Sequence, residues 1–314
     1  MPHAVEVFAP ATIANLGSGF DILGMALAAP YDTIYAERTE VPGVVIESIT
    51  GDNQRLPRDA EKNTAGIAAR FVLDQLMIHD YGVKLRIHKG LPLESGMGSS
   101  AASAAGAAVA VNALYDNLLR REELLLACVE AEAAVSGRHA DNVAPALLGG
   151  IVLITGLTPD SIYKLPVPDD LVLALVTPAV AVPTTQARAV LPKTIPFSDY
   201  VQQSAGVALL ITAIHRGDVA LMADAMSRDI LVEPAREHLM PGLREVRQAA
   251  HLAGALTTVI SGAGPTLCSI CNSTNVARLV TEATQAVYDQ LGIAATTLVT
   301  TPSRDGITLR VVEI

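Results

Sequence analysis

The residues between Gly90 and Asn112, GLPLESGMGSSAASAAGAAVAVN, have types and spacing that suit the binding of an anion. Glycine lets a backbone turn sharply and approach a ligand, and Ser99 or Ser100 can cap the alanine-rich helix that follows. The first amides of a helix point out of its end and carry a partial positive charge. We therefore expect a phosphate group to bind at the start of this helix. A glycine turn before a buried helix of small residues is the purely structural alternative.

Two common phosphate loops do not match this stretch. No Gly-Lys-Ser or Gly-Lys-Thr follows the glycines, so it is not a Walker loop. The glycine spacing also differs from G-x-G-x-x-G, and no acidic residue stands where a dinucleotide ribose would need it. A nicotinamide oxidoreductase is therefore disfavoured.

Polar residues gather in two further loops. APATIANLGSGFD places Asn15 and Asp21 around a tight turn, and RHADNVAPALLGG packs His139, Asp141 and Asn142 between apolar segments. Asp and Asn also bond to their own backbone in ordinary turns, so turn chemistry explains these residues equally well.

Two arginines stand beside proline-bounded loops, Arg188 in TTQARAVLP and Arg236 in VEPAREHLMP. A guanidinium group can bind a carboxylate in bidentate fashion, although most surface arginines are simply solvated. A third glycine loop, SGAGPT at residues 261–266, lies between two strand-like runs and predicts a hairpin.

The composition limits the kinds of partner that these loops can serve. The chain has 314 residues, which favours two domains, and half of them are hydrophobic. Its 22 basic and 32 acidic side chains give a net charge of −10. Nucleic-acid binding depends on neutralising phosphates with Lys and Arg, so a nucleic-acid partner is disfavoured.

The remaining patterns predict the elements that must position these loops. Strands are expected at residues 5–7, 31–38, 44–48, 83–88 and 151–156, with helices after Asn63, after the phosphate loop, and at 124–135, the last ending at Ser136-Gly137. A second unit is expected to contain a strand at 171–176, a Pro-rich linker to Pro196, helices at 200–226, 243–253 and 276–291, and strands at 256–260, 267–271, 296–299 and 307–312.

The cysteines and the apolar runs suggest a cytoplasmic protein. Cys128, Cys268 and Cys271 make an odd count, which suits a reducing compartment. Cys268 and Cys271 form C-x-x-C in a strand-like run, so we expect packing rather than a zinc site. The amino terminus lacks the pattern of a secretory signal, and the longest apolar run is too short to span a membrane.

Together, these motifs identify the chain as similar to a known family. APATIANLGSGFD, LPLESGMGSSAAS and ISGAGPT resemble the three ordered motifs of the GHMP kinases, and the middle one is specific to that superfamily. RHADNVAPALLGG, VEPAR and QARAVLP more narrowly resemble segments of the homoserine kinases. The resemblance extends from Val5 to at least Cys271.

The resemblance implies an α+β fold of two domains with the site in the cleft between them. Residues 1–156 would form a ribosomal-S5-like, ATP-binding domain, and residues 157–314 a ferredoxin-like domain. The implied reaction is the transfer of a phosphoryl group from ATP to L-homoserine, a step of threonine synthesis. A homodimer is also implied.

By the same resemblance, ATP and Mg²⁺ bind at the phosphate loop. The implied Mg²⁺ ligands are Ser100 and Glu132, a hydroxyl and a carboxylate, which suit a hard cation. Asn63 matches a position near the adenine. The expected nucleotide contacts are Asn63, Pro92, Leu93, Glu94, Ser95, Gly96, Met97, Gly98, Ser99, Ser100, Ala101, Ala102 and Gly264.

The implied substrate contacts are Asn15, Asp21, His139, Asn142, Arg188 and Arg236. Arg188 and Arg236 would hold the homoserine carboxylate, and Asp21 would hold its ammonium group. Asn15 and Asn142 would orient the reacting hydroxyl.

The resemblance leaves two interpretations of the proton transfer. Mevalonate kinase and galactokinase use an aspartate as general base, and Asp141 lies close to the matching place. The homoserine kinases are thought to use none, with the phosphate itself accepting the proton. We expect Asn142 to position the alcohol, with Glu132 and Ser100 completing the catalytic set.

Glu94 departs from the family pattern, because the GHMP kinases usually have a small residue at this position. A carboxylate aimed at the phosphates would repel them. Glu94 therefore favours one alternative function, a nucleotide or ligand sensor without catalysis. The other alternative is another small-molecule kinase of the superfamily, acting for example on mevalonate or shikimate.

Overall fold

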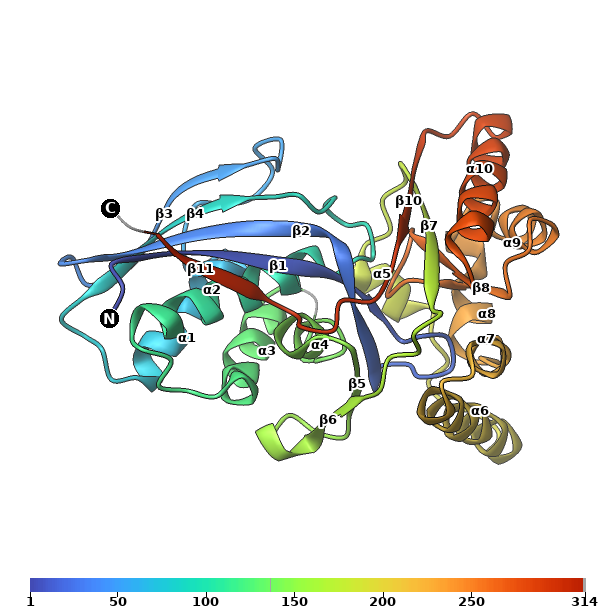
Figure 1. Ribbon diagram of the computed structural model, residues 1–314, viewed down its shortest axis with the longest axis horizontal. Coiled ribbons are helices and arrows are strands. Elements are labelled where there is room, and N and C mark those ends of the chain that lie inside the picture. Colours follow the sequence, from blue (N-terminus) through green and yellow to red (C-terminus); the bar gives the residue numbers. More distant parts are fainter. Residues whose placement is uncertain (136, 313–314) are drawn as a thin grey trace.

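Two β-sheets organise the chain, and helices pack against each of them (Figure 1). The structure is a computed structural model that describes residues 1–135 and 137–312. In this part of the chain, the strands form one seven-stranded and one four-stranded sheet. This mixture of helices and sheets confirms the α+β fold.

The first sheet has the order β11-β1-β2-β4-β3, with β5 paired to β2 and β6 paired to β5. Val7 in β1 faces both Ile34 in β2 and Leu309 in β11, so the last strand of the chain closes onto the first. The strands are β1 (Ala4–Ala14), β2 (Leu23–Thr39), β3 (Gly43–Thr50), β4 (Gly82–His88), β5 (Ile151–Ile154), β6 (Ile162–Leu165) and β11 (Thr308–Val312).

Helix α2 runs through the core beside this sheet because its residues are small. All but one of its residues are buried, and it packs on β1 and β2. A Cβ atom at Gly106 would lie 2.3 Å from Cδ1 of Ile34, so a larger residue here would displace the Ile34 side chain. The helices of this half are α1 (Thr64–Gln75), α2 (Ser99–Leu114), the short turn η1 (Arg121–Leu124), α3 (Leu125–Ala133) and α4 (Val143–Leu148).

The second sheet is antiparallel and has the order β10-β7-β9-β8, with α9 and α10 packed against it (Figure 1). Strands β8 and β9 form the hairpin expected around the SGAGPT loop. Its strands are β7 (Val172–Pro178), β8 (Thr257–Ile260), β9 (Leu267–Cys271) and β10 (Ala295–Thr300), and its helices are α9 (Leu243–Leu252) and α10 (Thr274–Gln290).

A group of helices lies between β7 and β8 in sequence (Figure 1), and α5 and α8 of this group contribute residues to the cavity. Helix α7 contacts β8, and α6 packs against α7. The elements of this group are α5 (Thr184–Ala189), α6 (Phe197–Arg216), α7 (Val219–Met226), α8 (Val232–Arg236) and η3 (Glu237–Leu239), whereas the short turn η2 (Pro159–Ser161) joins β5 to β6 in the first half.

Three features differ from the elements that the sequence predicts. The strands expected at residues 5–7 and 31–38 belong to the longer β1 and β2. The Pro-rich linker contains helix α5. Strands β6 and β11 follow residue 156 but pair in the first sheet, so the chain crosses between the two halves more often than a division at residues 156 and 157 implies. That division stays a prediction.

The structure also shows the cysteines of the C-x-x-C pair and the end of helix α3. Cys268 and Cys271 are buried free thiols that belong to different hydrophobic clusters, as packing on opposite faces of β9 requires. Helix α3 ends at Ala133, and Gly137 donates its N–H to the Glu132 carbonyl with φ of 113°. Ser136 of the expected cap lies outside the described residues.

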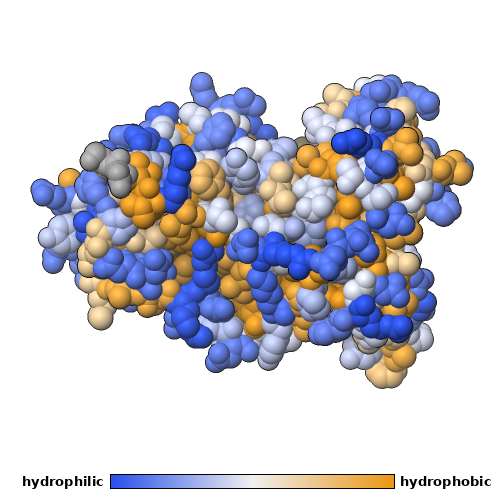
Figure 2. Space-filling view, in the orientation of Figure 1, coloured by the Kyte–Doolittle hydropathy of each residue, from blue (hydrophilic) through white to orange (hydrophobic). Residues whose placement is uncertain are grey.

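The surface is mixed in polarity. Hydrophobic residues on the face shown in Figure 2 lie in separate patches among hydrophilic ones, and the outline is indented where the two sheets meet. Within residues 1–135 and 137–312, each helix is either too short or too polar to cross a membrane.

Candidate active site

The phosphate loop leads into α2 at the bottom of a cavity of about 410 Å³. Gly96 and Gly98 have φ angles of 79° and 69°, which glycine adopts without strain. Gly98 is the residue before the helix, so Ser99 and Ser100 are its first residues and not its caps, contrary to the sequence prediction. Their N–H groups therefore point out of the helix end, which is where a phosphate binds.

A buried ion pair supports this loop from behind. The Lys89 ammonium contacts the Asp32 carboxylate and donates to the Ser99 carbonyl and the Ser103 hydroxyl, each at 2.7 Å. The other Asp32 oxygen accepts from the Gly90 and Leu91 amides at 3.0 Å. Burial lowers the pKa of Lys89, although the Asp32 carboxylate opposes that effect. This network holds both ends of the loop in place.

The SGAGPT loop of the second sheet holds the phosphate loop from the opposite side. The Ser261 hydroxyl donates to the Gly96 carbonyl at 2.7 Å, and the Thr266 amide donates to the Ser95 carbonyl at 3.1 Å. Asn15 connects the first half to the same SGAGPT loop, since its side-chain amide donates to the Gly262 carbonyl at 3.0 Å. The cleft is therefore built from both halves of the chain.

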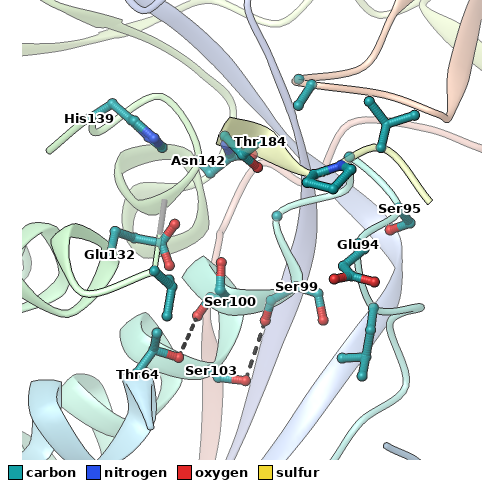
Figure 3. Close-up of a pocket in the computed structure, with 18 of the residues that line it drawn as sticks. Thr64, Glu94, Ser95, Ser99, Ser100, Ser103, Glu132, His139, Asn142 and Thr184 are labelled. Carbon is teal, nitrogen blue, oxygen red and sulfur yellow. Dashed lines mark hydrogen bonds between the residues drawn. The ribbon is translucent and has the colours of Figure 1, made fainter. Parts of the chain in front are cut away.

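Glu132 and Ser100 bring two oxygen ligands to one side of the cavity. Glu132 on α3 is 3% exposed and points toward Ser100 on α2 (Figure 3). The Thr64 hydroxyl donates to the Ser100 carbonyl at 3.2 Å, which fixes the first turn of α2 against α1. A carboxylate and a hydroxyl are hard oxygen donors, so the pair fits Mg²⁺ that completes its shell with phosphate oxygens and water.

Asn142 and Asp141 have different partners. The Asn142 side-chain oxygen accepts from the Thr12 hydroxyl at 2.8 Å, which leaves its amide nitrogen for another ligand. Asp141 is 3% exposed, and its Oδ1 lies 3.3 Å from Nδ1 of His139. A Cβ at Gly98 would lie 2.9 Å from the Asn142 side-chain oxygen, so Asn142 stands directly beside the phosphate loop.

Asp21, Arg188 and Arg236 form a charged group at the other end of the cavity. The Arg188 guanidinium makes a bidentate pair with Asp21 at 2.8 and 3.0 Å. Arg236 is 3% exposed and donates to the carbonyls of Ala187 and Gly262 at 3.0 and 2.8 Å. Burial lowers the pKa of the Arg236 guanidinium, and Arg188 lowers it further. Two cations and one carboxylate can receive an amino acid's charged ends.

Comparisons with known proteins agree with this geometry. Residues 63–150 match the family described as the GHMP kinases N terminal domain, and residues 210–290 match the GHMP kinases C terminal family. A homoserine kinase from Arabidopsis thaliana is 44% identical over 92% of this chain and 80% of its own length. The chain belongs to the homoserine kinase family of the GHMP kinases.

Two further homoserine kinases support this assignment. One from Chlorobium phaeobacteroides is 39% identical over 91% of this chain and 92% of its own length. The crystal structure of the one from Cytophaga hutchinsonii superposes with a TM-score of 0.94 at 40% identity, and covers 99% of this chain and 98% of that one. The GHMP kinase fold expected from the sequence is thereby confirmed.

Most residues that the family resemblance singles out line the one cavity. They are Asn15, Asp21, Asn63, Leu93, Glu94, Ser95, Gly96, Gly98, Ser99, Ser100, Glu132, His139, Asn142, Arg188, Arg236 and Gly264. Asn63 also caps α1, since its side chain accepts from the Ala65 amide and donates to the Pro57 carbonyl. The roles of these residues stay predictions.

Four expected nucleotide contacts lie elsewhere. Met97 is 4% exposed, and Ala101 and Ala102 are fully buried in the core, so their side chains are turned away from the cavity. Pro92 lines a second cavity next to Glu94. These residues shape the loop from behind, because the backbone, and not the side chains, faces the ligand in a glycine-rich loop.

Several residues of the cavity are not among the site residues predicted from the sequence. Lys89, Thr184, Arg55 and Phe20 all line it, and Phe20 lies under both guanidinium groups of the charged group, 5.5 and 5.2 Å from the two central carbons. One signal for the buried ion pair was present: Asp32 occupies the same face of its strand as Ile34 and Ala36. Thr184 lies in the segment interpreted as a linker.

Glu94 is paired with a cation, Arg55, which lies 39 residues earlier in the sequence. Its carboxylate accepts from the Arg55 guanidinium at 2.5 Å, and its backbone has φ of 54°. The cation compensates the charge that made nucleotide binding doubtful. Glu94 therefore no longer favours a sensor without catalysis over a kinase.

Proposed function

We propose that this chain transfers the γ-phosphoryl group of ATP to the side-chain hydroxyl of L-homoserine, giving ADP and O-phospho-L-homoserine for threonine synthesis. The observation that carries this proposal is the cavity itself. It joins a phosphate loop at a helix N-terminus to a group of two arginines and an aspartate that suits an amino acid.

As a member of this family, the chain uses ATP with Mg²⁺. Ser100 and Glu132 would hold the ion, which supplies charge neutralisation on the transferred phosphoryl group. The donor set agrees with this assignment, because Mg²⁺ in phosphoryl transfer needs one or two protein oxygens besides the phosphates. Among the described residues, no group of three or more His, Cys, Asp or Glu forms a separate metal site.

Arg188, Arg236 and Asp21 would hold the two charged ends of homoserine. Arg188 already pairs with Asp21, so an amino acid enters by inserting its carboxylate beside the guanidinium groups and its ammonium beside Asp21. Arg236 is held by two backbone carbonyls and presents a rigid cation. Three fixed charges would orient the substrate along the cavity toward the phosphate loop.

Asn142 would orient the reacting hydroxyl. In the transfer, the hydroxyl oxygen forms a bond to the γ-phosphorus as the bond from that phosphorus to the β-bridging oxygen breaks. The hydroxyl proton passes to an oxygen of the transferred phosphoryl group, and ADP leaves. Asn142 stands directly beside the phosphate loop, and phosphoryl transfer needs positioning more than covalent chemistry, which favours this route over a general base at Asp141.

The test is ADP release with ATP, magnesium and a panel of L-homoserine, L-threonine, mevalonate and shikimate. Turnover confined to homoserine supports the proposal. Turnover confined to another alcohol would retain the phosphate site and reject the substrate pocket, and nucleotide binding without turnover would favour the sensor.

A homodimer and a cytoplasmic location complete the proposal. Both rest on membership of a family of biosynthetic kinases. Light scattering on the purified full chain tests the first, because a monomeric mass at all concentrations would contradict it. Fractionation of cells that express the chain tests the second.

A further inference from the structure

The loop at residues 51–58 presents Arg55 to the phosphate loop from a fixed backbone. The buried Asp52 carboxylate accepts from the Leu56 amide at 3.1 Å, and the Asp52 carbonyl accepts from the Arg55 amide at 3.2 Å. A Cβ at Gly51 would lie 2.3 Å from the Lys89 carbonyl, so the loop packs closely on the residue that enters the phosphate loop. Arg55 is therefore anchored at its base.

Glu94 is also held by its backbone. It has φ of 54°, a left-handed conformation that costs a non-glycine residue conformational energy. The next residue, Ser95, donates its hydroxyl to the Pro92 carbonyl at 2.9 Å and accepts from the Thr266 amide. These contacts fix the backbone that carries the Glu94 carboxylate at the rim of the cavity.

Arg55 and Glu94 meet at the edge of the nucleotide site. Both line the main cavity with Gly96, Gly98 and Ser99, and both also line the second cavity on the other side of the phosphate loop. Their side chains are about half exposed, at 52% and 49%, so the pair forms a bridge across the rim.

We propose that Arg55 is a positioning residue for the nucleotide, acting through Glu94. The Arg55 guanidinium closes the rim of the nucleotide site and cancels the negative charge that Glu94 places beside the phosphates. Loss of Arg55 then weakens the affinity for a charged nucleotide because it leaves the Glu94 carboxylate uncompensated, and removal of Glu94 offsets that loss. This inference rests on the proposed function, because it assumes that phosphates bind at Gly96 to Ser99.

The electrostatic argument predicts a rescue. Without Arg55, an uncompensated carboxylate lines the same cavity as the bound polyphosphate, and like charges repel even at a partly solvated site. Removing Glu94 as well removes that repulsion. A purely structural role of Arg55 predicts the opposite, since each deletion would then loosen the loop further.

The experiment measures the dissociation constants of MgADP and of adenosine for Arg55→Ala, Glu94→Ala and the double variant. Arg55→Ala is expected to weaken MgADP about three- to fivefold, in the range of exposed ion pairs, and to leave adenosine unchanged. The double variant is expected to bind MgADP about as tightly as the wild type, because it removes both charges of the pair. The Arg55→Ala defect should shrink at high salt, and Arg55→Lys should largely restore affinity.

The matched control is Arg70→Ala, which removes another exposed ion pair, with Glu61, outside the cavity. It should leave both ligands unaffected. Equal weakening of MgADP in Arg55→Ala and the double variant would overturn the proposal, as would parallel loss of adenosine binding or no loss at all.

The kinetic counterpart is a rise in KM for ATP with kcat nearly unchanged. Because binding is measured without homoserine, failure of this inference is distinguishable from failure of the kinase assignment. A chain that binds MgADP with the predicted rescue but phosphorylates nothing in the panel would retain the inference and reject the reaction.

Discussion

Asn142 and Asp141 are neighbours in sequence, yet the structure gives them different chemistry. The Asn142 side chain is fixed by Thr12 and stands beside Gly98, where the phosphate loop ends. Asp141 is buried next to His139. A group that positions the alcohol must lie near both reactants, whereas a general base must be free to accept a proton.

Replacing Asn142 by Ala is therefore expected to lower kcat by about 100-fold or more, with the affinity for nucleotide nearly unchanged. Asp141→Asn keeps the shape of the side chain and should lower kcat less. Steady-state kinetics together with MgADP binding measures both effects. A larger loss of kcat in Asp141→Asn than in Asn142→Ala would instead identify Asp141 as the base.

At the scale of elements, α8 positions Arg236 through a buried carboxylate. Glu233 accepts from the Ile260 amide at 2.6 Å and pairs with Arg247 of α9, so it ties α8 to both β8 and α9. Burial raises the pKa of Glu233 to about 7, against the opposing effect of Arg247. Glu233 thus fixes α8, the helix that carries Arg236, although burial makes its carboxyl group costly to ionise.

Stability should depend on pH through this acid. The folded pKa of about 7 lies above the ordinary 4.5, so Glu233 contributes stability fully below pH 4.5, and that contribution is lost as pH rises toward 7. At 1.36 kcal/mol per unit, the loss is at most roughly 3 kcal/mol. Between pH 4.5 and 7, the free energy of unfolding should fall for the wild type but not for Glu233→Gln. Urea unfolding of both proteins should therefore show that the variant becomes more stable relative to the wild type as pH rises.

Glu237→Gln is the matched control on the same segment. Its hydrogen bond from Arg244 lowers the pKa of Glu237, so its contribution to stability is present above pH 4.5 and is lost as pH falls further. Relative to the wild type, the free energy of unfolding of Glu237→Gln should therefore rise as pH falls, which is opposite to the trend expected for Glu233→Gln. A pH-independent difference for Glu233→Gln would contradict the assignment.

At the scale of the whole molecule, the end of the chain completes the first half. After β10 of the second sheet, the chain returns to pair β11 with β1. Ile307 is 1% exposed, its amide donates to the Ala146 carbonyl, and its own carbonyl accepts from Arg121. The chain therefore passes between the two halves twice, from β6 to β7 and again from β10 to β11.

Ile307→Ala should lower the free energy of unfolding by about 3 kcal/mol, because it leaves a cavity in the first half. Arg310→Ala on the same segment removes an exposed ion pair with Glu6 and should change the stability little. Urea unfolding followed by far-UV circular dichroism measures both. An equally small effect of Ile307→Ala would mean that the returning segment is dispensable for stability.

The sequence by itself determined the family, the α+β class and the phosphate loop, because these depend on local patterns. Glycine spacing and the small residues of α2 act within a few residues of one another, and the motifs retain their order along the chain. The strand and helix periodicities located most elements for the same reason.

Only the tertiary structure decided which charges meet. The pairs of Lys89 with Asp32, Arg55 with Glu94, and Arg188 with Asp21 join residues that are 57, 39 and 167 positions apart. The return of β11 to β1 is a similar long-range pairing. An ion pair or a strand pairing depends on distance in space, which one sequence does not report when the partners lie in different elements. Folding brings these charges to the two ends of one cavity, where the proposed reaction needs them.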